Sequence, residues 1–154
     1  MQHGQLKSII QRYEQAHFTV NRRLNALIRK DMGEEMTLDQ YSTIRYILSR
    51  SRCKSSELAD AFCVGKSSIT AIVTRLVDKR LISRIPDEKD RRVTYLSVTE
   101  EGKRLSDEVE ERIQELLYGY MGQFDGKEAL AFIETFEKLA KVLTEPAEGG
   151  HETK

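Results

Sequence analysis

The segment spanning residues 66–80 most strongly constrains the fold of this chain. Its apolar residues recur three or four positions apart, which is the spacing that gathers side chains on one face of an α-helix. The segment therefore predicts an amphipathic helix with one face in a protein core. The apolar positions are Ile69, Ile72, Val73, Leu76 and Val77.

The opposite face of this helix is slim and polar. It carries hydroxyl and methyl groups with one long cation, where a surface helix more often carries Glu and Lys. A helix that enters the DNA major groove needs such a small hydrogen-bonding face, and its N-terminal N–H groups favour phosphate. Arg75 suits either guanine or phosphate. The residues expected to contact DNA are Ser67, Ser68, Thr70, Ala71, Thr74 and Arg75.

A hairpin with a charged tip follows this helix. Residues 82–86 and 93–98 read as strands, and the second of them alternates apolar and polar side chains. The tip is basic apart from Asp90, whose carboxylate can hold an arginine in an extended conformation through a charge-assisted hydrogen bond. The alternative is a solvated hairpin tip with no partner. The tip residues expected to contact DNA are Lys89, Asp90, Arg91 and Arg92.

These motifs resemble those of a known family. Residues 90–92 (Asp-Arg-Arg), followed by residues 96–99 (Leu-Ser-Val-Thr) and Gly102, are similar to the wing signature of the MarR family of bacterial transcriptional regulators. Residues 69–77 resemble that family's recognition helix. At Arg80 the family often has a glycine that closes the helix, so we expect the helix to end here with another capping geometry.

The resemblance also implies roles for the charged tip. In the family, the matching aspartate orients the second arginine, which enters the DNA minor groove. The resemblance therefore implies that Asp90 orients Arg92 toward the minor groove, and that Lys89 and Arg91 contact the DNA backbone.

The predicted fold is mainly α-helical. It is a winged helix-turn-helix with a small β-hairpin wing, flanked by N- and C-terminal dimerisation helices. Residues 1–154 form a single MarR-like domain. Within it, residues 37–98 form the DNA-binding winged helix-turn-helix, residues 5–34 and 99–145 form the dimerisation helices, and residues 146–154 form a flexible polar tail.

Short polar motifs mark where several helices begin. Thr37 and Gln40 have the spacing of a capping box. Ser55 or Ser56 is expected to cap the first helix of the helix-turn-helix, and Thr99 the long helix after the wing.

The net charge of zero hides a marked segregation of charge. Residues 50–95 contain 11 Lys and Arg against 6 Asp and Glu, a net charge of +5. Residues 96–154 contain 7 against 14, a net charge of −7, and residues 1–49 contain 7 against 5, a net charge of +2. Such a distribution directs the middle of the chain toward phosphate.

The helices at both ends of the chain are too apolar to stand alone. A second copy of the same helices is the expected partner, which gives a symmetric homodimer. Such a dimer presents two recognition helices about one DNA turn (~34 Å) apart, as a palindromic operator requires. The alternative is a monomer in which both helical blocks cover the winged domain.

The sequence does not predict an enzyme. The run 65–67 (Gly-Lys-Ser) ends like a phosphate-binding loop, but that motif requires a glycine where Asp60 stands. Cys53 and Cys63 lack metal-ligand spacing, and we expect Cys63 to be a small core residue. We therefore expect no catalytic residues, no cofactor and no metal.

The function predicted from these features is sequence-specific regulation of transcription. We expect a repressor of palindromic double-stranded DNA that a small-molecule effector releases, with an effector site that the sequence does not identify. The alternative is a winged-helix module that binds protein or RNA. No apolar run approaches the ~20 residues of a membrane helix, and a signal-peptide pattern is missing, so we expect a cytoplasmic protein.

Overall fold

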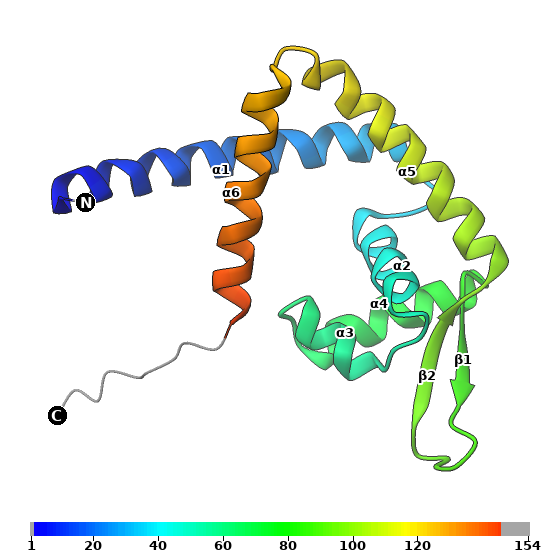
Figure 1. The fold of residues 1–154 in the computed structure, drawn as a ribbon. Coiled ribbons are helices and arrows are strands. Elements are labelled where there is room, and N and C mark those ends of the chain that lie inside the picture. The colour runs from blue at the N-terminus through cyan, green and yellow to red at the C-terminus, as the bar shows by residue number, and fades with distance from the viewer. Residues whose placement is uncertain (1, 146–154) are drawn as a thin grey trace, which may run out of the picture. The chain divides into compact units, whose positions relative to one another are not determined.

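The computed structural model describes residues 2–145 of the chain, so the predicted tail at residues 146–154 lies outside the described residues. The chain divides into two compact units, residues 1–116 and 117–154, which are described separately. The described residues form helices and one β-hairpin (Figure 1). In chain order the elements are α1 (His3–Met32), α2 (Leu38–Arg50), α3 (Ser55–Ala61), α4 (Lys66–Asp78), β1 (Ile82–Pro86), β2 (Thr94–Val98), α5 (Glu100–Met121) and α6 (Gly126–Thr144).

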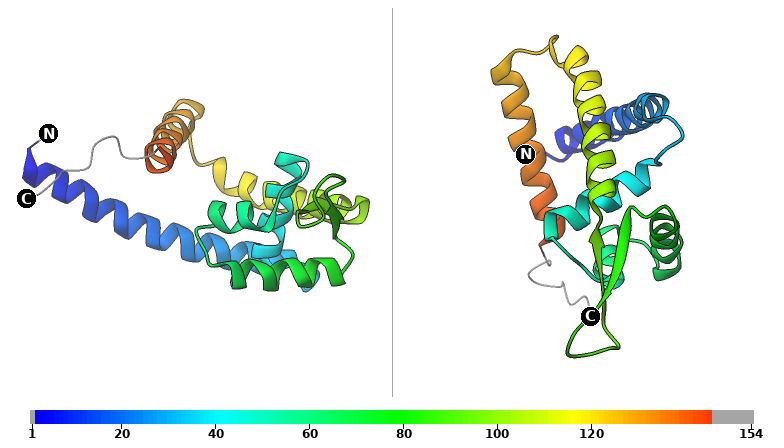
Figure 2. Two further views of the ribbon diagram at one scale, coloured as in Figure 1. Left: turned by 90° about the horizontal axis from the view of Figure 1, so that it is seen from below. Right: turned by 90° about the vertical axis from the view of Figure 1, so that its right-hand side faces the viewer.

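The core of the first unit lies where α2, α3, α4 and the hairpin meet. Helices α3 and α4 lie side by side (Figure 2), and α4 buries the centre of the apolar face predicted from its sequence. The fully buried side chains include Ile44 and Ile47 from α2, Leu58 from α3, Ile69, Val73 and Leu76 from α4, and Leu96 from β2.

The predicted capping box at the start of α2 is confirmed. The Thr37 hydroxyl accepts the Gln40 N–H at 3.2 Å, and the Gln40 side-chain oxygen accepts the Thr37 N–H at 3.3 Å. The same buried oxygen accepts a hydrogen bond from Lys79 Nζ at 3.0 Å, and Lys79 also donates to the Glu35 carbonyl at 3.1 Å. The end of α4 is thus bound directly to the turn between α1 and α2.

The predicted cap of α3 was wrong. Lys54 is the residue before the helix, and Ser55 is already its first helical residue. The Glu57 carboxylate reaches back and accepts the Lys54 N–H at 2.9 Å. Because this carboxylate satisfies the backbone group at the helix start, no serine hydroxyl is needed there.

The expected end of α4 was also wrong. Arg80 adopts a left-handed conformation with φ 59°. Its N–H donates to the Val77 carbonyl at 2.9 Å, and the Leu81 N–H donates to the Leu76 carbonyl at 3.0 Å. These two bonds define the Schellman motif, the ending that a glycine normally provides. The helix therefore ends with the usual geometry, and arginine bears the steric cost of the glycine position.

Helix α3 ends in the same way at Cys63. Cys63 has φ 52°, its N–H donates to the Asp60 carbonyl at 3.2 Å, and the Val64 N–H donates to the Ala59 carbonyl at 3.1 Å. This position turns the Cys63 side chain to solvent, so its predicted core role was wrong. The buried cysteine is Cys53, where burial raises the pKa of the thiol to about 11, with a smaller contribution from Glu57.

The two predicted strands form an antiparallel hairpin that extends beyond the helices (Figures 1 and 2). Their register pairs Ile82 with Val98 and Pro86 with Thr94. On its other edge, β2 pairs with the segment before α3, where the Leu96 N–H donates to the Cys53 carbonyl at 2.7 Å and the Cys53 N–H donates back at 3.1 Å. The wing is therefore tied to the helix-turn-helix along its base.

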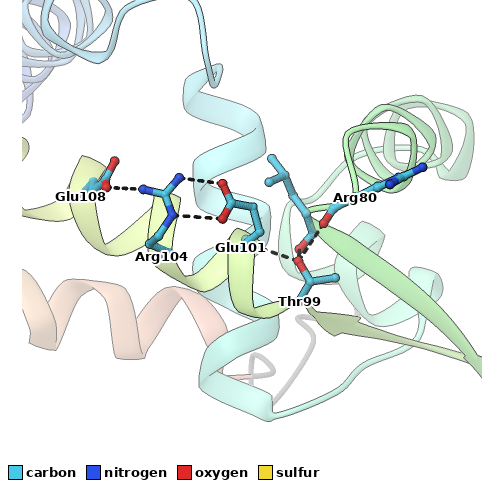
Figure 3. A network of polar contacts seen from close by, with 7 residues as sticks. Arg80, Thr99, Glu101, Arg104 and Glu108 are labelled. Atoms are coloured by element: carbon cyan, nitrogen blue, oxygen red, sulfur yellow. Dashed lines mark hydrogen bonds and ion pairs between the residues drawn. The ribbon is translucent and has the colours of Figure 1, made fainter.

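Thr99 caps α5, as predicted, and joins it to the end of α4 (Figure 3). Its hydroxyl accepts the Gly102 N–H at 3.0 Å and donates to the Arg80 carbonyl at 2.8 Å. Gly102 is required here because a Cβ atom at this position would lie 2.0 Å from the Leu81 carbonyl oxygen. On the outer face of the same turn, Arg104 pairs with Glu101 and Glu108 (Figure 3).

The apolar faces of α1 and α6 are exposed in the single chain. Asp125 caps helix α6, because its carboxylate accepts the Lys127 N–H at 2.7 Å, and the helix buries none of its side chains. In α1 only Ile28 and Met32 are buried. The exposed apolar side chains include Leu6, Ile9, Ile10 and Tyr13 on α1, and Leu130, Ile133, Phe136, Leu139 and Leu143 on α6.

Among the described residues, the structure contains no helix with the length and apolar character needed to cross a membrane.

The left-handed conformation of Arg80 predicts a stabilising substitution. A non-glycine residue pays about 1–2 kcal/mol in this region, and glycine returns about 0.5–1 kcal/mol of that as lost chain entropy. Arg80→Gly should therefore raise the free energy of unfolding by roughly 0.5–1 kcal/mol in denaturant titration. Arg80→Ala is the control, because it removes the guanidinium and keeps the strained Cβ atom. Equal stability of the two variants would contradict a steric cost at this position.

Candidate nucleic-acid interface

Helix α4 presents the small polar face that its sequence predicts. The six candidate residues of this helix are all exposed, while Ile69, Val73 and Leu76 on the opposite side are buried. The side chains on the exposed face are small enough for a base edge to approach the helix backbone. The exposed candidates are Ser67, Ser68, Thr70, Ala71, Thr74 and Arg75.

The N-terminus of α4 has the electrostatic character of a phosphate site. Gly65 precedes the helix and supplies no capping side chain. The first N–H groups of a helix and the positive end of its dipole favour an anion. Lys66 adds a cation at the first helical position, and the Thr70 hydroxyl is turned back to the Lys66 carbonyl at 2.8 Å. The Thr70 oxygen can therefore accept a hydrogen bond from a ligand but has committed its proton.

The wing tip holds Arg92 against Asp90. The Asp90 carboxylate accepts the Arg92 Nε–H at 3.1 Å, the Arg92 backbone N–H at 3.0 Å and Nη2 at 3.4 Å. The Arg92 side chain is nevertheless 91% exposed. The hydrogen bond from the Arg92 side chain, followed by that from its backbone, holds the pKa of Asp90 below its usual range. This carboxylate therefore stays charged and fixes the start of an arginine that projects into solvent.

A second aspartate, Asp87, stabilises the turn at the wing tip by accepting hydrogen bonds from the backbone. The Asp87 carboxylate accepts the Lys89 N–H at 2.8 Å and the Asp90 N–H at 3.4 Å. These backbone bonds, that to Lys89 first, lower the pKa of Asp87. The turn presents Lys89 and Arg91 as exposed cations on either side of Asp90.

Sequence reasoning missed two cations beside the wing, Arg52 and Lys54. They flank Cys53, the residue that pairs with β2, and the Arg52 guanidinium lies 4.2 Å from the centre of the Tyr95 ring. The alternation of cation, apolar residue and cation is the signal of a short strand with one buried face. A stretch of three residues is too short for that signal to be recognised without the structure.

A surface hollow of about 510 Å³ lies between α2 and α3. Its cation, Arg45, is already paired with Glu110 at 2.8 Å and Asp107 at 3.5 Å, so it has little charge left to offer an anionic ligand. Within the described residues, the acidic, cysteine and histidine side chains do not gather into a group that could hold a metal ion. The exposed cations and polar groups that could bind a nucleic acid therefore lie on α4 and the wing.

Comparisons with known proteins identify the family. The MarR family profile matches residues 36–94, which span α2 to the start of β2. The HTH-type transcriptional regulator FarR of Neisseria gonorrhoeae is 30% identical over 108 residues, covering 70% of this chain and 73% of FarR. The crystal structure of YusO from Bacillus subtilis is 30% identical, with a TM-score of 0.63 over 92% of this chain and 99% of that one.

The fold is also that of a protein solved on DNA. A mutant MarR of E. coli complexed with operator DNA has a TM-score of 0.71 to this chain, at 20% identity, over 88% of this chain and 96% of that one. This similarity concerns the fold, whereas the matches to the family profile, FarR and YusO extend to the sequence. The chain therefore belongs to the MarR family of winged helix-turn-helix transcriptional regulators.

Proposed function

We propose that the chain is a cytoplasmic repressor that binds a palindromic operator in double-stranded DNA as a homodimer and is released by a small-molecule effector. The observation that carries this proposal is the wing tip, where Asp90 fixes an arginine that is 91% exposed. An exposed, pre-oriented guanidinium beside a small polar helix face suits simultaneous contact with the minor and major grooves.

Each reading element has a distinct role in this proposal. The face of α4 around Ala71 and Thr74 contacts base edges in the major groove, and Arg75 contacts either guanine or phosphate. Ser67 and Ser68 at the helix start contact phosphate. In the wing, Arg92 enters the minor groove while Lys89 and Arg91 contact the backbone.

Binding of RNA or protein fits these elements less well. The major groove of A-form RNA is too deep and narrow to admit the side chains of a helix such as α4. A protein partner would favour apolar or aromatic anchors, whereas the exposed face of α4 carries serines, threonines, one alanine and one arginine. The face therefore matches the major groove of B-form DNA better than either alternative.

The homodimer is proposed from the exposed apolar faces of α1 and α6. Leaving these faces in water is unfavourable by about 25 cal/mol for each Å² of apolar surface, and a second copy buries both. A two-fold dimer with half-sites about 34 Å apart matches one turn of DNA. Bound at a promoter, such a dimer excludes polymerase, and an effector that changes the separation of the two reading heads weakens binding through a coupling of typically about 1–3 kcal/mol.

The operator is found by selecting bound duplexes from a random pool with the full chain. The expected product is one inverted repeat with half-site centres about one helical turn apart. Recovery of single-stranded or structureless sequences, or of no enriched sequence, would contradict the proposal.

Removing the wing arginine should weaken operator binding. Arg92→Ala is expected to cost about 1–3 kcal/mol of binding free energy, because a base-edge contact is lost. Asp90→Asn should cost less, since it removes only the charge that orients Arg92. Both are measured by titration of the selected duplex at fixed salt. Unchanged affinity of Arg92→Ala would refute a minor-groove role, and tighter binding by Asp90→Asn would make Asp90 a simple repulsive charge.

Base reading and phosphate binding should separate by salt dependence. Ala71→Glu is expected to abolish preference for the operator, because a carboxylate on the reading face meets base edges and phosphates, whereas Ala71→Ser keeps the face small and should retain binding. Lys89→Ala should weaken all duplexes alike and reduce the salt slope by about one unit for each wing, since each phosphate contact contributes about 0.9 unit. Normal operator binding by Ala71→Glu would exclude α4 from the major groove.

The homodimer should depend on the apolar face of α6. Leu139→Glu places a charge in the proposed contact and is expected to lower the molecular mass measured by sedimentation equilibrium, because a buried, unpaired charge is costly. Lys138→Glu introduces the same side chain on the adjacent polar face and should leave the dimer intact. A folded monomer for the unmodified chain would overturn the proposed assembly.

A further inference from the structure

At the base of the wing, a short extended segment, residues 52–54, pairs with β2 and carries two cations. Cys53 pairs with Leu96, and both side chains are buried on the face of the hairpin that packs against the helices. Successive residues of an extended chain point to opposite faces. Arg52 and Lys54 therefore lie on the outer face of the wing, together with Tyr95, the neighbour of Leu96.

The ring of Tyr95 holds both cations. The Arg52 guanidinium lies 4.2 Å from the ring centre and the Lys54 ammonium 5.9 Å from it. Both distances are within the range of a cation–π interaction. In the described part of the chain, neither cation lies within salt-bridge distance of a carboxylate, although Arg52 is close enough to Asp87, and Lys54 to Asp90, to help lower the pKa of each carboxyl. Arg52 is exposed and Lys54 half-buried.

This surface is continuous with the wing tip. Tyr95 lies on β2, which begins at Thr94, two residues after Arg92 in the turn at the wing tip. The positive charge of Lys54 also reaches the tip, where it adds to the hydrogen bonds from Arg92 that lower the pKa of Asp90. The wing thus carries cations at both its tip and its base, together with the carboxylates of Asp87 and Asp90.

We propose that Arg52 and Lys54, seated on the ring of Tyr95, form a second phosphate-binding surface that engages the DNA backbone at the rim of the minor groove. The inference rests on the proposed operator binding and extends it. The minor groove is about 7.5 Å deep. A wing whose tip reaches into the groove therefore brings its paired strands close to the phosphates that border the groove. The long side chains of Arg52 and Lys54 then span the remaining distance to these phosphates.

The chemistry of the surface favours phosphate over other partners. A guanidinium stacked on a ring loses little conformational freedom when it binds, and it keeps its planar N–H donors free for phosphate oxygens. Two cations that bind phosphate also release condensed counterions from DNA. The surface therefore adds affinity for any duplex, and sequence preference remains with α4 and the wing tip.

The test is the salt dependence of operator binding by the double variant Arg52→Gln/Lys54→Gln of the full chain. Each phosphate contact contributes about 0.9 unit of slope, and a dimer carries both contacts twice, so the slope should fall by roughly 3–4 units. When salt is raised from about 50 to about 200 mM, affinity for the operator should fall in both proteins. The factor by which it falls should be roughly a hundredfold smaller for the double variant than for the unmodified chain. Its preference for the operator over a scrambled duplex should be retained.

Two controls separate this surface from general charge and from folding. Arg50→Gln removes a neighbouring cation that stacks on Tyr46 instead, at 5.2 Å, and should leave the slope unchanged. Tyr95→Leu removes the ring but keeps both charges, so it should lower affinity severalfold with little change of slope, while Tyr95→Phe should bind like the unmodified chain. Melting curves check that each variant is folded.

The outcomes distinguish this inference from the function on which it rests. If the unmodified chain binds its operator and the double variant has the same salt slope, the second surface is refuted and the proposed function stands. An equal loss of slope in Arg50→Gln would also refute it, because the effect would then be diffuse charge. If the unmodified chain binds no duplex, both proposals fail.

Discussion

Two backbone hydrogen bonds between Cys53 and Leu96, at 3.1 and 2.7 Å, hold the wing against the helices. They connect the segment before α3 to β2, which is more than forty residues away along the chain. Because backbone pairing fixes direction and register together, these bonds determine where the wing tip lies relative to α4. The Cys53 side chain is buried beneath them, and its raised pKa keeps the thiol protonated at neutral pH. Cys53 therefore acts as a packing residue of the hairpin base.

The helix-turn-helix is compact because its helices end abruptly. Ser51, Cys63 and Arg80 each adopt a positive φ at the end of α2, α3 and α4, respectively. A left-handed residue at such a position ends the helix and turns the chain away from it. Non-glycine residues at such positions carry strain, which the packing of Leu58, Ile69 and Leu76 outweighs. Local backbone strain is thus maintained by the core that it helps to shape.

The elements with strong periodicity were predictable from the sequence, and the contacts between distant segments were not. The apolar stripe of α4, the two strands and the capping box at Thr37 appear where the sequence indicates. The Glu57 cap of α3 was missed because a serine is the commoner signal. The ending at Arg80 was missed because arginine disfavours the left-handed backbone conformation that tertiary packing imposes on it.

The candidate interface shows the same division. The residues of α4 and the charged tip were assigned from local pattern, and the contact between Asp90 and Arg92 is local as well, two residues apart. Arg52 and Lys54 reach the wing only through a non-local backbone pair. A sequence carries no short-range record of such a pair, so cations positioned in this way look like ordinary surface charge until the structure is known.

Lys79 connects the reading helix α4 to the start of α2 and to the segment before it. It stands at the end of α4 and donates to the Glu35 carbonyl, in the segment between α1 and α2, and to the buried side-chain oxygen of Gln40 in α2. A charge-assisted bond to a buried acceptor is costly to break without replacement. The Lys79 side chain therefore links the end of α4 to the segment that joins α1 to α2 and to the start of α2. Since a ligand shifts a conformational equilibrium only by its differential affinity for the two states, an effector would act on α4 through this link only by binding one arrangement of the link more tightly than another.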